Sequence, residues 1–202
     1  MTKHIILTIL LTLAGSHHLF AQTTPVNQNS ATFTKNLGIS LNYSPKSFQF
    51  LGKMQNTEQI YLSAIYNFTE LQMGSLNMHL GSQLIFAGQI EFPIDGLDGP
   101  RETRTGFGLI PINLQIPLFE SKRPVFVTSS AGFIITDVSF PNALGTRFNY
   151  ILDLGIGYQF YQAQNHSLQA GYKLSHLSNG NSSIENPGID AHMFFIKVLF
   201  DL

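Results

Sequence analysis

The sequence contains no cysteine, few charged residues and no long apolar run beyond its first residues. The absence of cysteine excludes disulfides, so an exported chain of this kind holds together without them. Charged residues make up 11% of the chain, against about 25% in ordinary soluble domains. No basic cluster points to nucleic acid, and no apolar run reaches the ~20 residues of a membrane helix. A closed β-barrel remains as a way to cross a membrane, because its strands pair all backbone groups with one another.

The first 21 residues have the features of a secretory signal peptide. One Lys and one His precede an apolar run over 5–13, and small or neutral residues lead to Ala21. We therefore predict cleavage after Ala21. The polar segment 22–36 is expected to form a flexible N-terminal arm, and residues 37–202 to form a single barrel domain.

Eight segments after this arm alternate apolar and polar residues with the period of two that a β-strand requires. They lie at roughly 37–43, 58–68, 75–91, 104–118, 124–136, 147–161, 166–178 and 189–201. The alternation is clearest in the sixth segment. Its apolar face carries Tyr150, Leu152, Leu154, Ile156, Tyr158 and Phe160.

The fourth segment is expected to place five aliphatic residues on one face and Asn113 and Gln115 on the other. These aliphatic residues are Ile110, Ile112, Leu114, Ile116 and Leu118. Pro111 and Pro117 cannot donate to the ladder, so they mark a bulge or a strand end.

The fold class that fits best is all-β, an eight-stranded antiparallel transmembrane β-barrel. A soluble β-sandwich also alternates, but here the polar faces carry Asp, Asn, Gln and Gly, as the filled interior of a small barrel would. The expected connections alternate in length. The short ones are Thr69–Gly74, Glu120–Arg123 and Gln162–Asn165; the longer ones are about 44–57, 92–103, 137–146 and 179–188. Barrels of this class place short turns in the periplasm, so both termini are expected there and the long loops outside.

The seventh and eighth strands carry chemically reactive side chains where apolar ones are expected. Continued in register, the apolar face of 166–178 ends in His176 and Ser178, and that of 189–201 begins with Asp190. Antiparallel pairing of the two strands brings the three together on the outer surface. A Ser, a His and a carboxylate can act together: the Ser as nucleophile, the His as the general base that activates it, and the carboxylate as the acid that orients the base. The alternative is an ordinary set of polar residues at headgroup level.

The residues His176-Leu177-Ser178-Asn179 and Asn186-Pro187-Gly188-Ile189-Asp190 resemble the H-x-S-N … N-x-G-x-E signature of the PagL-type lipid A 3-O-deacylases. The resemblance extends to the spacing, to the placement on the last two strands and to an eight-stranded barrel with a cleaved signal. It implies an outer-membrane serine esterase that removes an ester-linked acyl chain from lipid A of lipopolysaccharide.

The resemblance also implies roles for individual residues. Ser178 would be the nucleophile, His176 the general base and Asp190 the acid, with Asn186 and Asn179 stabilising the oxyanion or positioning the substrate. The sequence departs from the family pattern at Asp190, where the signature has the longer Glu. Glu185 in the preceding loop is therefore a second candidate for the acid.

Other polar residues have weaker functional interpretations. Arg101 and Arg104, expected on an extracellular loop, could meet the phosphates of lipid A. His79 is expected to face the barrel interior as a hydrogen-bonded filler, and His192 to lie at the membrane interface. No cluster has the spacing of metal ligands, and no cofactor is expected.

Two other functions stay open on the sequence alone. One is a non-enzymatic small barrel, structural or binding. The other is a phospholipid esterase, since the outer-membrane phospholipase A also carries His and Ser two residues apart on a strand, although in a twelve-stranded barrel. The expected partners are lipid A and the membrane, and the sequence leaves a homodimer open.

Overall fold

The computed structural model describes residues 35–73, 76–118 and 124–202, all within one compact unit, Phe33–Leu202. The strands are β1 (Asn36–Ser44), β2 (Ser47–Phe48), β3 (Glu58–Met73), β4 (Leu76–Pro93), β5 (Arg101–Pro117), β6 (Val125–Phe140), β7 (Thr146–Gln162), β8 (His166–Ser178) and β9 (Ile189–Asp201). No helix in these ranges is long and apolar enough to cross a membrane. The predicted signal peptide and nearly all of the predicted arm lie outside the described residues.

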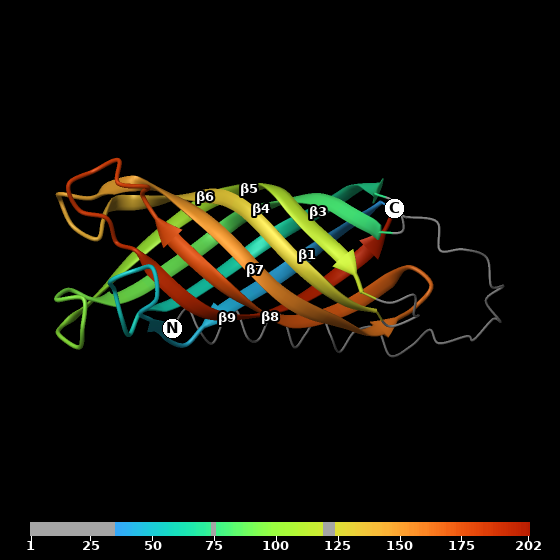
Figure 1. The fold of residues 1–202 in the computed structure, drawn as a ribbon, viewed down its shortest axis with the longest axis horizontal. Helices are drawn as coiled ribbons and strands as arrows, with labels where there is room; N and C mark the ends of the chain where they lie inside the picture. Colours follow the sequence, from blue (N-terminus) through green and yellow to red (C-terminus); the bar gives the residue numbers. More distant parts are fainter. Residues whose placement is uncertain (1–34, 74–75, 119–123) are drawn as a thin grey trace. The chain divides into compact units, whose positions relative to one another are not determined.

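Eight of the strands form a closed antiparallel barrel, because β1 pairs with both β3 and β9. Neighbours in sequence are neighbours in the wall, so the strands run up and down in turn. Figure 1 shows the β1–β3, β4–β5, β6–β7 and β8–β9 connections together at one end, with the C-terminus at the other. The predicted fold class is confirmed, and β8 and β9 have the predicted bounds.

Several strands are longer than predicted, so parts of the expected connections 69–74, 92–103 and 137–146 belong to the wall. β3 continues to Met73, and the segment 69–73 is strand where a turn was expected. β4 continues to Pro93 and β6 to Phe140. Polar residues near the strand ends, such as Glu70 and Gln72, look like turn residues in the sequence, but their backbone pairs with the neighbouring strand.

The short strand β2 continues the pairing of β1 along β9 after a break. β1 pairs with β9 as far as Tyr43 and Phe194, and β2 resumes with Ser47 opposite Ala191. The break contains Pro45, which has no N–H for the ladder. The chain therefore stays against β9 up to the loop end of the barrel, a feature that the sequence reading did not predict.

Apolar side chains cover the exterior of the wall. The apolar face predicted for β7 points outward, and its six residues are 36% to 59% exposed. On the opposite face of the same strand, Asn149 and Asp153 are buried in the barrel. An apolar outer surface on a closed barrel is the arrangement that contact with lipid requires.

The predicted facing of β5 was wrong at one position. Ile110 is buried in the interior, whereas Leu109 and Ile112 are exposed outside. The register between β5 and β6 shifts between Leu109 and Ile112, around Pro111. The proline therefore marks the predicted bulge, and the bulge reverses the alternation on its N-terminal side.

Polar groups fill one part of the interior. The Lys173 ammonium donates to Asp153 Oδ2 at 2.6 Å, and Ser130 Oγ donates to the same oxygen at 2.8 Å. The ammonium of Lys197 lies 4.7 Å from the centre of the Phe195 ring. Pairing and cation–π contact compensate the loss of water around these buried charges.

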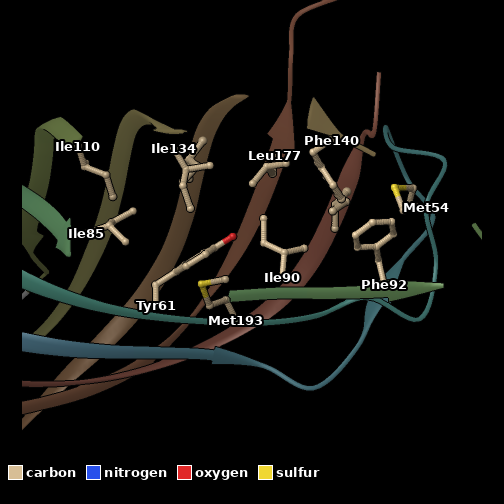
Figure 2. Packing of buried hydrophobic residues seen from close by; sticks show 12 residues of the cluster. Met54, Tyr61, Ile85, Ile90, Phe92, Ile110, Ile134, Phe140, Leu177 and Met193 are labelled. Atoms are coloured by element: carbon tan, nitrogen blue, oxygen red, sulfur yellow. The ribbon is translucent and has the colours of Figure 1, made fainter. Parts of the chain in front are cut away.

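An apolar plug fills the interior near the loop end, where the sequence reading expected polar side chains throughout (Figure 2). Its members are Met54, Tyr61, Ile85, Ile90, Phe92, Ile110, Ile134, Phe140, Ile151, Leu177, Ile189 and Met193. The rings of Phe92 and Phe140 meet edge to face, with their centres 4.8 Å apart. The plug makes this end of the barrel a packed core instead of an open mouth.

We expect Phe140→Ala to lower the free energy of unfolding by about 3–5 kcal/mol, because it leaves a cavity in the plug. The folded fraction can be followed in detergent with increasing urea, from the faster migration of the folded barrel on unheated gels. Leu154→Ala, which truncates an exposed exterior residue, is the control. An equal loss of stability in both variants would show that the plug adds nothing.

Candidate active site

His176 and Ser178 lie near the end of β8, both half-buried on the outer side of the wall. Side chains two residues apart on a strand share a face, with their Cα atoms about 7 Å apart. In β9, Asp190 is the direct cross-strand partner of His176. The structure therefore brings the three predicted residues to one exterior patch at the loop end.

His176 and Asp190 are in direct contact. The imidazole Nδ1 lies 2.7 Å from Asp190 Oδ1. The side chain of His176 is 24% exposed and that of Asp190 only 5%. Since a carboxylate accepts, Nδ1 carries the proton, and the Nε2 lone pair is left to act as a base. The shorter side chain of Asp190 thus reaches the imidazole.

The second oxygen of Asp190 is held by three consecutive backbone N–H groups. Phe50, Leu51 and Gly52 donate to Oδ2 at 3.1, 2.7 and 2.6 Å. These donors come from the turn after β2, far from Asp190 in sequence. Sequence reasoning missed them, because backbone donors have no side-chain signature; the nearest signal is the Pro and Gly content of 45–52.

The turn approaches β9 so closely that Gly52 has no room for a side chain. A Cβ at this position would lie 1.9 Å from the carbonyl oxygen of Gly188. The same carbonyl accepts from the N–H of Lys53 at 2.7 Å. Gly188 itself has a φ of +48°, a conformation that glycine adopts readily. Glycine at both positions therefore allows the turn to close over Asp190.

Glu185, the second candidate for the acid, is engaged elsewhere. Its Oε2 accepts from Asn142 Nδ2 at 2.6 Å, and its N–H donates to the carbonyl of Leu144. Both contacts tie the β8–β9 loop to the β6–β7 loop. The carboxylate in contact with His176 is that of Asp190, so the geometry favours Asp190 as the acid.

The two asparagines expected near the oxyanion shape the loop beside Ser178. Asn186 Oδ1 accepts from the backbone N–H of Asn179 at 3.0 Å, and Asn186 Nδ2 donates to Asn181 Oδ1 at 3.0 Å. Asn179 is fully buried, and its Nδ2 donates to the carbonyl of Glu185 at 2.7 Å. A positioning role fits these contacts, and contact with an oxyanion stays a prediction.

The inner side of the same strands is anchored in the apolar plug. Leu177, between His176 and Ser178, is 1% exposed, and Ile189, before Asp190, is fully buried. Because alternate residues point to opposite sides of the wall, each reactive side chain has a buried neighbour. The patch therefore rests on a rigid platform.

Arg101 and Arg104 belong to β5 and not to a loop, which corrects the prediction, because the β4–β5 hairpin pairs as far as Arg101. Arg101 Nε donates to Glu91 Oε1 at 2.8 Å. Arg104 is paired with Glu102 and lies over the ring of Phe92, 5.3 Å from its centre. These contacts occupy both guanidinium groups at the barrel rim, and phosphate binding by them stays a prediction.

The two other histidines considered in the sequence, His79 and His192, have structural contacts. His79 shares a face with its cross-strand partner Gln115, which is buried in the interior, as predicted. His192 is exposed on the exterior, where it stacks on Phe48 and is hydrogen-bonded to the Tyr172 hydroxyl. In the part of the chain that the structure describes, no group of three or more His, Asp or Glu side chains could hold a metal ion.

The chain is similar to known proteins over most of its length. The family model described as "Lipid A 3-O-deacylase (PagL)" matches residues 51–198. Among solved structures, one described as "Crystal structure of the outer membrane enzyme PagL" has a TM-score of 0.56 and 16% sequence identity. That match covers 79% of this chain and 97% of the other, which supports the fold. No curated protein matches this chain.

If Asp190 orients His176, we expect Asp190→Ala to slow the reaction of Ser178 with a fluorophosphonate by roughly a thousandfold or more, as loss of a triad acid does. The rate can be measured from intact-protein mass spectra of the purified barrel in detergent.

Glu185→Ala is the matched control, and we expect its labelling rate to stay within about twofold of the unsubstituted protein, since its contacts lie in the loops. A loss of labelling with Glu185→Ala alone would reverse the assignment of the acid. Labelling at another serine in the unsubstituted protein would contradict the choice of Ser178.

Proposed function

The chain belongs to the lipid A 3-O-deacylase (PagL) family, and we propose that it removes an ester-linked acyl chain from lipid A with Ser178, His176 and Asp190. The family is one of ester hydrolases. The observation that carries the proposal is the 2.7 Å contact between His176 and Asp190, two residues from Ser178 on the same exterior face.

The chemistry follows the Ser–His–acid scheme. His176 Nε2 accepts the proton of Ser178 as its Oγ attacks the ester carbonyl, and Asp190 stabilises the imidazolium that forms. The tetrahedral intermediate then collapses, and the sugar hydroxyl leaves with the proton from His176. Water then attacks the acyl-serine and gives one proton to His176; the second tetrahedral intermediate collapses as His176 returns this proton to Ser178 Oγ, which releases the fatty acid.

The exterior position of the patch suits a substrate that lies in the membrane. A soluble substrate would need a cleft or channel, whereas an acyl chain in the outer leaflet reaches the wall sideways. Around the patch, Tyr150 and Leu152 in β7 and Leu174 in β8 are exposed on the same outer face. They offer apolar contact to the acyl chain while its ester meets Ser178.

This proposal places the protein in the outer membrane, with the loop end outside and both termini in the periplasm. The exposed apolar exterior supports the membrane location, and the longer connections at the end that carries the patch support the orientation. The cleaved signal over residues 1–21 would supply export. Lipid A in the outer leaflet would be the partner.

We expect Ser178→Ala to abolish deacylation, because the hydroxyl that forms the acyl intermediate is lost. Mass spectra of lipid A from cells that express the unsubstituted protein should show the loss of one ester-linked acyl chain. Cells that express Ser178→Ala should match cells without the protein.

Ser167→Ala, at a buried serine in the same strand, is the control and should deacylate normally once folded. Identical lipid A in all cells would refute the deacylase proposal and leave a non-enzymatic barrel. Release of fatty acid from phospholipid vesicles, without any change in lipid A, would instead identify a phospholipid esterase.

A further inference from the structure

We propose that residues 49–52, the acid-binding turn, are a positioning element that holds the Asp190 carboxylate against His176. The inference deepens the proposed function and rests on it, because it gives the turn a role only if Asp190 is the catalytic acid. The turn acts through the backbone N–H groups of Phe50, Leu51 and Gly52, which donate to the carboxylate, and not through its side chains.

The contacts divide the carboxylate between two tasks. Oδ1 faces His176, and Oδ2 accepts all three N–H groups of the turn. A carboxylate fixed at both oxygens cannot rotate away from the imidazole. Three N–H donors also favour its ionised form, which is the form that stabilises a developing imidazolium.

The turn compensates for the burial of Asp190. The residue is 4% exposed, and a buried carboxylate without partners would be costly. Burial keeps out the water that would otherwise solvate the carboxylate. The N–H groups of consecutive residues act as a concave anion site and replace that water.

The turn is itself held in place at both ends. On its N-terminal side, Phe48 pairs with Asp190 in the β2–β9 ladder, and Ser47 Oγ donates to the carbonyl of Met54 at 3.1 Å. On its C-terminal side, Lys53 donates to Gly188, and Met54 bridges to Ile189. The donors are therefore preorganised, and Asp190 does not need to order them.

The side chains of Phe50 and Leu51 in the turn are largely exposed. Phe50 is 76% exposed and Leu51 70%, although their N–H groups face Asp190. This separation allows the backbone donor and the side chain to be tested independently at one position. Leu51→Pro removes the donor, and Leu51→Ala keeps it.

The test is the rate at which a fluorophosphonate labels Ser178 in the full-length folded barrel. Since this probe needs no lipid, the rate reports activation of Ser178 and not binding of substrate. We expect Leu51→Pro to slow labelling about tenfold or more, the factor that one hydrogen bond to a charged group carries. Leu51→Ala should leave the rate within about twofold.

Gly52→Ala is the second variant, because its Cβ would push the turn off the Gly188 carbonyl. It should also slow labelling, and it keeps the test open if Leu51→Pro does not fold. Folding of each variant is checked by the migration of the unheated barrel on gels.

A double-mutant cycle separates positioning from general damage to the barrel. If the turn acts through Asp190, Leu51→Pro or Gly52→Ala should cost nothing further in the Asp190→Ala background, measured over hours at high probe concentration. An equal slowing in both backgrounds would overturn the inference, as would an unchanged rate in Leu51→Pro.

Failure of the proposed function gives a different result. Unchanged labelling in Asp190→Ala would remove Asp190 from the site and with it the role of the turn. Slow labelling in Asp190→Ala, with normal rates in both turn variants, would refute the positioning role of the turn and leave Asp190 as the acid.

Discussion

The hydrogen-bond ladder that closes β1 onto β9 is the constraint on which the structure depends. In contact with lipid, each backbone N–H and C=O needs a partner within the protein, and only a closed sheet gives one to every strand. Closure fixes which side of each strand faces outward. The period of two then decides the place of every side chain in the wall, including the three that form the candidate site.

The site lies on a surface that barrels usually cover with aliphatic side chains. His176, Ser178 and Asp190 occupy outward positions, while Leu177 and Ile189 between and beside them enter the plug. The same alternation that exposes the reactive groups thus packs their neighbours. The buried neighbours hold the strands of the site rigid from inside the barrel, and the reactive side chains face the outer surface. Rigid support of the site and its exposure to lipid are therefore met on opposite sides of the wall.

The sequence predicted the barrel, its eight wall strands and the outward facing of His176, Ser178 and Asp190, because all of these follow from alternation within a strand. It did not predict the inward turn of Ile110, since a bulge at Pro111 shifts the alternation by one residue. The sequence also did not predict the donors of the acid-binding turn. Every residue except proline has a backbone N–H, so the residue types do not show which N–H groups will face a carboxylate. Whether Asp190 reaches His176 depends on how closely two strands approach, a distance that no single strand encodes.

The acid-binding turn follows β1 and β2 at the start of the barrel, and Asp190 is the second residue of the last strand, β9. Their contact runs beside the β1–β9 pairing, so it forms only when the two ends of the sheet meet. A sheet that is still open can pair β8 with β9, and so His176 with Asp190, but it lacks the three N–H donors that hold the Asp190 carboxylate. Closure of the wall and support of the Asp190 carboxylate therefore depend on the same event, the meeting of the first and last strands of the sheet.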